Sequence, residues 1–143
     1  MSQALVITVG AERFGLPVER VGAVFRVEGM TRVPLTAPDF AGLHNLRGKT
    51  VAVVHLARRF DAAAPPPGRR PMAVTIEAAS DSYAIIVDDV GDVIDLSAGQ
   101  RIETPSHADA RRAAMTAAVY RLGAEALAIL DVERLFDPAP EAA

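Results

Sequence analysis

Ser106, His107 and Asp109 are the residues whose types come closest to a catalytic set, because a hydroxyl, an imidazole and a carboxylate make up a hydrolase triad. In a working triad these groups converge from separate elements around an exposed nucleophile. Here they are neighbours in one short segment, which does not provide that convergence. We interpret the segment as a solvated loop, and a small hydrolase that uses these three residues is the alternative from another functional class.

The histidines His44, His55 and His107 are the residues to consider for a metal site. Metal ligands are usually found at short helical or hairpin spacings, with carboxylates or cysteines nearby, whereas these histidines lie far apart in the sequence. The acidic run Asp88–Asp95 lacks the pattern of a calcium loop. There is no cysteine and no phosphate-binding glycine loop. The sequence therefore predicts no catalytic residue, no cofactor and no metal.

Arg47 is a better candidate for recognition than for catalysis. It stands between Leu46 and Gly48, directly before an apolar run, so we expect a turn to hold its backbone while the tip of its side chain stays free. A guanidinium group pairs with carboxylates in a fixed geometry. The sequence thus predicts that Arg47 contacts a partner.

Most apolar segments are short, rich in Val and Ile, and separated by Gly, Pro or Asp, which favours β structure. The expected strands are Leu5–Val9, Phe14–Pro17, Lys49–Leu56, Met72–Ala78 and Tyr83–Val87. Lys49–Leu56 is expected to be buried on both faces, and the alternation in Met72–Ala78 predicts one inward face. Ala108–Leu122 is helical by propensity, and we expect a helical or irregular start followed by a strand that turns at Gly123.

Two pairs of segments resemble each other within the chain. Phe14–Val24 aligns without gaps with Tyr83–Val93, and Val51–Phe60 aligns with Leu127–Phe136, in the same order. Val-rich strands can match by chance, but two ordered matches favour a duplicated unit packed against its own copy.

The alignment also predicts local roles. Asp131 follows a strand and is expected to cap a short helix with its carboxylate, and His55 occupies the same place in the first half. Asp88–Asp89 aligns with Glu19–Arg20, which predicts an exposed edge.

With 143 residues the chain has the length of a single domain, here expected to span residues 1–143 as a mainly β protein. A proline-rich stretch at 62–71 is expected to be an exposed loop between two lobes at about 14–63 and 72–124. Segments 1–13 and 125–143 would then cross between the lobes or cap them.

Charge and hydropathy limit the partners. The net charge is −3, and the basic residues form no long block, so nucleic acid is not expected. No apolar run approaches the roughly 20 residues of a membrane span, and the N-terminus lacks the pattern of a secretory signal. We therefore expect a cytoplasmic protein without direct membrane insertion.

Asn45–Gly48, followed by the strand that runs to Leu56, resembles the signature turn of the CheW family of chemotaxis adaptors. Further segments resemble that family in order along nearly the whole chain: Phe14–Val21, Val33–Pro34, Pro38–Gly42, Val87–Val93 and Leu130–Leu135.

The resemblance implies two five-stranded, SH3-like barrels and a non-enzymatic adaptor role. The implied partners are the regulatory domain of the histidine kinase CheA and the cytoplasmic tip of methyl-accepting chemoreceptors, which would recruit the protein to membrane-bound arrays. The residues implied in receptor or kinase binding are those of the turn, Asn45, Leu46, Arg47 and Gly48, and those of the segment beside the groove between the lobes, Val18, Val21 and Val24.

The sequence departs from the family pattern at three positions. Ala23 stands where the family often has a Glu that would pair with the Arg of the turn, His55 replaces an Asp, and Ala52 replaces a Pro. A CheW-like scaffold of a non-chemotactic two-component pathway is therefore an alternative function.

Overall fold

The structure is a computed structural model that describes residues 3–10, 12–27, 40–56, 72–78, 81–103 and 114–135. Its elements in chain order are β1 (Gln3–Val9), β2 (Glu12–Pro17), the 3₁₀ turn η1 (Val18–Arg20), β3 (Val21–Arg26), β4 (Phe40–Leu46), β5 (Lys49–His55), β6 (Met72–Ala78), β7 (Asp81–Val87), β8 (Asp89–Asp95), the 3₁₀ turn η2 (Leu96–Ala98), β9 (Gln100–Ile102), β10 (Thr116–Leu122), β11 (Glu125–Leu130) and α3 (Val132–Leu135). The predicted connector at 62–71, Ser106, His107, Asp109, and residues 108–113 lie outside the described residues.

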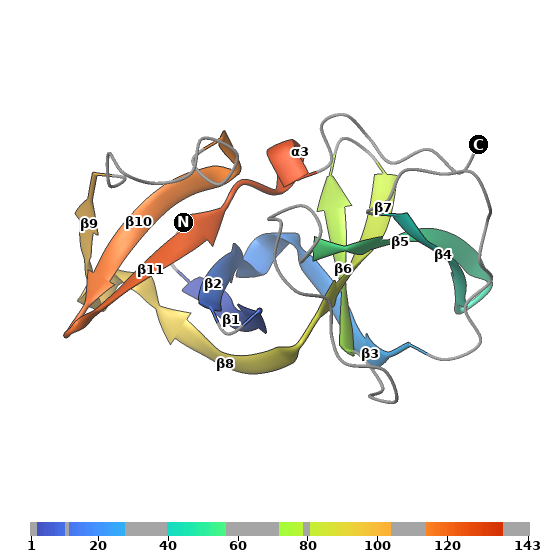
Figure 1. The fold of residues 1–143 in the computed structure, drawn as a ribbon, viewed down its shortest axis with the longest axis horizontal. Helices are drawn as coiled ribbons and strands as arrows, with labels where there is room; N and C mark the ends of the chain where they lie inside the picture. Colours follow the sequence, from blue (N-terminus) through green and yellow to red (C-terminus); the bar gives the residue numbers. More distant parts are fainter. Residues whose placement is uncertain are drawn as a thin grey trace.

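The strands form two sheets, one of six strands in the order β8-β1-β2-β11-β10-β9 and one of five in the order β3-β6-β7-β5-β4 (Figure 1). Each sheet combines antiparallel hairpins with one parallel pair, β2 with β11 in the first and β5 with β7 in the second. The first sheet exceeds the expected five strands because the short β9 pairs with the outer side of β10.

The register of the two sheets supports the duplication. Ala128 lies opposite Phe14 in the first sheet, and Ala52 lies opposite Tyr83 in the second. These are equivalent positions in the two aligned matches. The antiparallel pairs agree as well, because Val21 faces Ile76 across β3 and β6 just as Val90 faces Ile7 across β8 and β1.

The two halves of the chain exchange strands. The hairpin β1–β2 pairs with strands of the second half, β8 and β11, while the hairpin β6–β7 pairs with β3 and β5 of the first half. The sheets thus cut across the expected lobe limits of 14–63 and 72–124, because the strands of each sheet find their partners far away in sequence.

A central apolar cluster joins the two sheets. Its fully buried members include Ile7, Leu16, Leu56, Ile76, Ile85, Leu130 and Leu135. Burying one such side chain contributes roughly 1.5–3 kcal/mol. Each sheet also encloses a smaller cluster of its own, with Ala4, Val6 and Ile129 in the first and Ala73, Val53 and Ala84 in the second.

Ring stacking brings the two edge strands of the five-stranded sheet together. Phe25 of β3 and His44 of β4 lie with their ring centroids 4.8 Å apart and their planes 21° apart. Because β3 and β4 stand at opposite ends of the strand order, this contact shows that the sheet curls round on itself.

Several local predictions are confirmed. β5 is buried on both faces, since Val53 lies in the inner cluster of its sheet and Val54 in the central cluster. Residues 116–130 form the expected hairpin around Gly123. The Asp131 carboxylate accepts hydrogen bonds from the backbone N–H groups of Glu133 and Arg134, and so caps α3 (3.1 and 3.4 Å).

Two predictions are wrong. β6 has two buried faces, because Ala73 and Thr75 are buried on one face while Val74 and Ile76 on the other belong to the central cluster. The predicted exposed edge holds for Asp89 only. Asp88 is half-buried. Its Oδ2 accepts a hydrogen bond from the backbone N–H of Gly10, which lies in the turn between β1 and β2 (2.8 Å).

Candidate interaction surface

The turn between β4 and β5 places Arg47 at the tip of a hairpin. Leu46 and Lys49 are the last paired residues, so Arg47 and Gly48 form a two-residue loop. Their φ angles are 53° and 82°, which fits a type I′ turn with two left-handed residues. The Asn45 Oδ1 accepts a hydrogen bond from the Gly48 N–H at 2.9 Å and holds the turn. The Arg47 side chain is exposed.

The second half of the chain provides an internal comparison for this turn. Its equivalent hairpin, β10–β11, turns at Gly123 and Ala124, and Gly123 takes the positive φ of 65°. A left-handed residue other than glycine costs roughly 1–2 kcal/mol. Arg47 thus occupies the position at which the equivalent turn has a glycine, which adopts a positive φ without strain. Residues with such backbone strain cluster at functional sites.

A β-bulge shapes the segment that carries the predicted valines. The register of β3 against β6 shifts between Val21 and Val24, so Gly22 and Ala23 form the bulge. The Ala23 N–H donates a hydrogen bond to the Thr75 Oγ1 at 2.6 Å. A Cβ on Gly22 would lie 2.4 Å from the same oxygen. Glycine is therefore required here, because a side chain would displace the hydroxyl that satisfies the bulge.

The three predicted valines differ in exposure as a result. Val21 packs against the central cluster, and Val18 is half-buried on η1. After the bulge, Val24 points outward with 43% of its surface exposed. Of the three, Val24 alone is an exposed apolar residue that a partner could contact.

The curl of the five-stranded sheet relates these valines to the Arg47 turn. Phe25 follows Val24, and His44 precedes Asn45, so the ring stack sets β3 beside β4. Val24 and Asn45 thus belong to adjoining strands, whereas Val18 lies on η1, before β3 begins.

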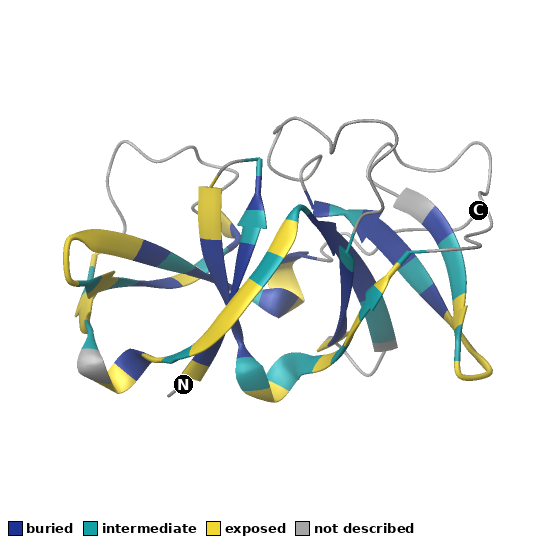
Figure 2. Cartoon of the chain, turned by 90° about the horizontal axis from the view of Figure 1, so that it is seen from below, coloured by how far each residue is buried: buried dark blue, intermediate teal, exposed yellow. Residues whose placement is uncertain are grey.

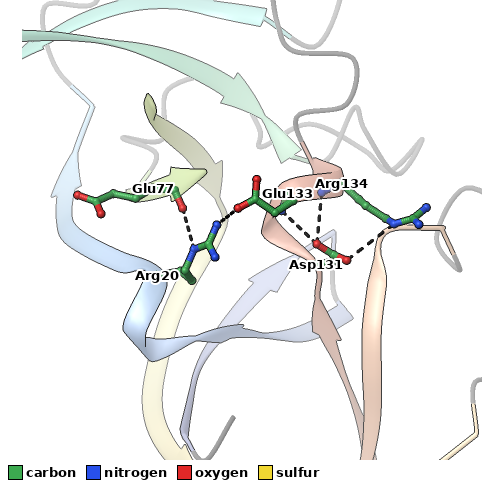
Figure 3. A network of polar contacts seen from close by, with 5 residues as sticks. All are labelled: Arg20, Glu77, Asp131, Glu133 and Arg134. Atoms are coloured by element: carbon green, nitrogen blue, oxygen red, sulfur yellow. Dashed lines mark hydrogen bonds and ion pairs between the residues drawn. The ribbon is translucent and has the colours of Figure 1, made fainter. Parts of the chain in front are cut away.

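Arg20 fixes the start of β3. Its Nε donates to the Glu77 carbonyl oxygen at 2.9 Å, and its Nη2 pairs with the Glu133 carboxylate (Figure 3). Glu77 belongs to the five-stranded sheet, while Glu133 lies on α3, which follows the six-stranded sheet. Arg20 therefore links the two sheets directly beside the predicted valines, and the sequence pattern alone did not single it out.

Three kinds of feature are absent among the residues that the structure describes. Arg47 forms no ion pair with any of them. In the same part of the chain, no three His, Asp or Glu side chains gather as a metal site would require. Nor does a described helix have the length and apolar character to cross a membrane.

Comparisons with known proteins agree with this geometry. A family model described as a CheW-like domain matches residues 3–139. The chain belongs to the CheW-like domain family. The chemotaxis protein CheW of Klebsiella aerogenes is 28% identical over 132 residues, which cover 92% of this chain and 79% of that protein.

A solved structure confirms the fold of this CheW-like chain. The crystal structure of the scaffolding protein TtCheW from Thermoanaerobacter tengcongensis superposes with a TM-score of 0.81 at 23% identity. The match covers 95% of this chain and 92% of that one. The expected mainly β architecture with two SH3-like parts is therefore confirmed.

Proposed function

We propose that the chain is a chemotaxis adaptor that couples chemoreceptors to the histidine kinase CheA. Family membership and the relative named as a chemotaxis protein support this role. The observation that carries the site is Arg47, an exposed cation held in a left-handed turn where the equivalent hairpin uses glycine. In this proposal the chain acts as one CheW-like domain over residues 1–143 and has no catalytic role.

The turn formed by Asn45, Leu46, Arg47 and Gly48 would face the receptor tip, and the guanidinium would pair with a receptor carboxylate. The segment with Val18, Val21 and Val24 would lie beside the kinase or receptor in the groove between the sheets. The protein would work in the cytoplasm and reach the membrane only through receptor arrays.

An adaptor without chemistry of its own can still change kinase output. Bridging favours one kinase state only if the bridge binds that state more tightly than the other. A rigid connection between receptor-facing and kinase-facing residues would transmit such a preference, and Arg20 supplies one link between the two sheets.

The test is a receptor pull-down with Arg47→Glu. We expect binding to the cytoplasmic tip to fall at least tenfold, which corresponds to about 1.4 kcal/mol, because the charge reverses at the proposed contact. Arg121→Glu is the matched control, since Arg121 is exposed on the equivalent hairpin of the other half. A folded Arg47→Glu protein that binds the receptor tip as well as the wild type would refute the assignment.

Ala23 favours a second candidate function, a scaffold of a non-chemotactic two-component pathway. Without a carboxylate at this position, Arg47 is left for a partner other than the intramolecular Glu common in the family. Binding to the regulatory domain of the cognate CheA distinguishes the two: an adaptor of the chemotaxis array binds it, whereas a scaffold of a separate pathway does not.

A further inference from the structure

The chain crosses between the two sheets at matching places in its two halves. The 3₁₀ turn η1 (Val18–Arg20) takes it from β2 of the six-stranded sheet to β3 of the five-stranded sheet. In the second half, Asp88 takes it from β7 of the five-stranded sheet to β8 of the six-stranded sheet. The internal alignment makes Glu19 the equivalent of Asp88. The two crossings can therefore be compared position by position.

The hairpins that contact these crossings match as well. In β1–β2, Thr8 faces Arg13, and in β6–β7, Glu77 faces Ser82. Arg13 and Ser82 stand directly before the two aligned segments. Their partners Thr8 and Glu77 are therefore equivalent positions. Each hairpin thus presents an equivalent carbonyl group to the crossing of the other half.

The two crossings are attached to these carbonyl groups by different donors. The Thr8 carbonyl oxygen accepts a hydrogen bond from the backbone N–H of Asp88 at 2.8 Å. The Glu77 carbonyl oxygen accepts one from the Arg20 Nε at 2.9 Å. In the described part of the chain the Glu19 N–H makes no bond to this oxygen, so the Arg20 side chain takes the place of the backbone. A side chain can release its partner without a change in the path of the backbone.

The turn η1 has no apolar anchor of its own. None of its residues is buried and it has no side-chain cap, and in Figure 2 it is coloured as partly exposed or exposed throughout. The helix α3, by contrast, buries Val132 and Leu135 in the central cluster. The Arg20 Nη2 pairs with the Glu133 carboxylate on α3 (Figure 3). Arg20 therefore ties a weakly anchored turn to a firmly anchored helix.

We propose that Arg20 is a positioning residue of the adaptor, through which the binding of one partner changes the affinity for the other. A partner that binds the valines beside η1 shifts this turn, and the shift reaches α3, at the end of the six-stranded sheet, through the ion pair with Glu133. Such coupling needs an element with two arrangements. The side-chain attachment at η1 permits a second arrangement, which the backbone bond of Asp88 does not. The inference rests on the proposed function, because the two partners are the receptor tip and CheA.

The test measures the affinity of the full-length protein for the regulatory domain of CheA, with and without a saturating concentration of the receptor tip. The ratio of the two dissociation constants is the coupling factor, and we expect at least about five for the wild type, the lower end of the usual range. Glu133→Ala should lower it by roughly threefold to fivefold, which is as much as one half-exposed ion pair supplies. Each partner alone should bind this variant within about twofold of the wild type, because Glu133 lies outside the proposed binding residues.

Glu125→Ala is the matched control. Glu125 pairs with Arg13 at 2.8 Å, and both lie on strands of the six-stranded sheet, so the loss of this pair should leave the coupling factor unchanged. Both substitutions remove an exposed carboxylate from an ion pair and should change the free energy of unfolding by similar small amounts. The double variant Arg20→Glu with Glu133→Arg should restore part of the coupling that Arg20→Glu removes, because it rebuilds the ion pair without the bond to Glu77.

The outcomes separate this inference from the proposed function. If the wild type does not bind the kinase domain or the receptor tip, the proposed function is wrong and the inference falls with it. If it binds both, but its coupling factor is one or is the same in Glu133→Ala, the inference alone is overturned. An equal loss of coupling in Glu125→Ala also overturns it, as does a double variant that couples no better than Arg20→Glu. Circular dichroism confirms that each variant is folded.

Discussion

At the scale of single residues, the proposed role of Arg47 in binding comes at a cost in stability. Its backbone is left-handed at φ 53°, while the equivalent turn in the second half places Gly123 at φ 65°. A two-residue connection such as the one between β4 and β5 favours a type I′ or II′ turn, and both types require a positive φ at the first central residue. We therefore expect this side chain to serve the proposed partner contact rather than the fold.

Arg47→Gly should therefore raise the free energy of unfolding by about 0.5–1 kcal/mol while it abolishes the proposed receptor contact. The gain is the relief of left-handed strain, reduced by the greater freedom of glycine in the unfolded chain. Chemical denaturation measures the first effect and a receptor pull-down the second.

Gly48→Ala is the matched control, because Gly48 also has a positive φ and a Cβ there would meet nothing within 4 Å. We expect it to lower stability by about 1 kcal/mol through backbone strain alone. If Arg47→Gly destabilised the protein, the argument that Arg47 is kept for binding would fail.

At the scale of elements, the β3 bulge depends on one hydroxyl. Thr75 is the buried polar residue of β6, with 9% of its surface exposed, and its Oγ1 accepts from the Ala23 N–H at 2.6 Å. At the equivalent bulge in the second half, Gly91 lies against the apolar Val6. The bulge at Gly22 and Ala23 is thus held by a side-chain hydroxyl, whereas Gly91 of the other bulge lies against an aliphatic side chain.

Thr75→Val should lower the free energy of unfolding by about 1–3 kcal/mol, because it leaves the Ala23 N–H without its partner in a partly buried place. Denaturant unfolding measures the loss, and hydrogen exchange at Ala23 locates it. Thr75→Ser, which keeps the hydroxyl, should protect the Ala23 amide as the wild type does. Equal exchange rates in Thr75→Val and Thr75→Ser would contradict the role given to the hydroxyl.

Elements could be predicted from the sequence where the determining contacts are local. The strand at Leu5–Val9, the hairpin around Gly123 and the Asp131 cap all follow from neighbouring residues, and all are confirmed. The parallel pair β2–β11 joins residues over a hundred positions apart, so no local sequence pattern predicts it. For the same reason the sequence predicts lobes that are continuous stretches of chain.

Candidate site residues divide in the same way. Arg47 could be recognised from the residues beside it, as the turn geometry is local. The exposure of Val24, by contrast, depends on the bulge that Thr75 holds from another strand. The exposure of Val93 and the contacts of Arg20 cannot be predicted from neighbouring residues, because they depend on the packing of distant segments.

At the scale of the whole molecule, the exchange of strands makes the two sheets interdependent. Among the described strands, residues 1–71 contain the hairpins β1–β2 and β4–β5, but β3 pairs only with β6. Residues 72–143 contain the described hairpins β6–β7 and β10–β11, while in the described part of the chain β8 pairs only with β1. An isolated hairpin is marginally stable at best in water, so neither half can complete a sheet alone.

The two halves, produced as separate chains 1–71 and 72–143, should each be largely unfolded and should fold together when mixed. Circular dichroism of the single and mixed fragments measures this, and a mixture of either fragment with its own copy is the control. Cooperative unfolding of one fragment by itself would show that the exchange of strands is not needed for stability.

The parallel pairing of β2 with β11 also has a consequence for synthesis. β2 is among the first strands to leave the ribosome, and β11 is nearly the last. One side of β2 must therefore wait without its partner while most of the chain is made, and β1 waits in the same way for β8. A nascent chain in this state exposes unpaired strand edges, which are the kind of surface that invites aggregation. The protein should accordingly depend on chaperones more during translation than after it.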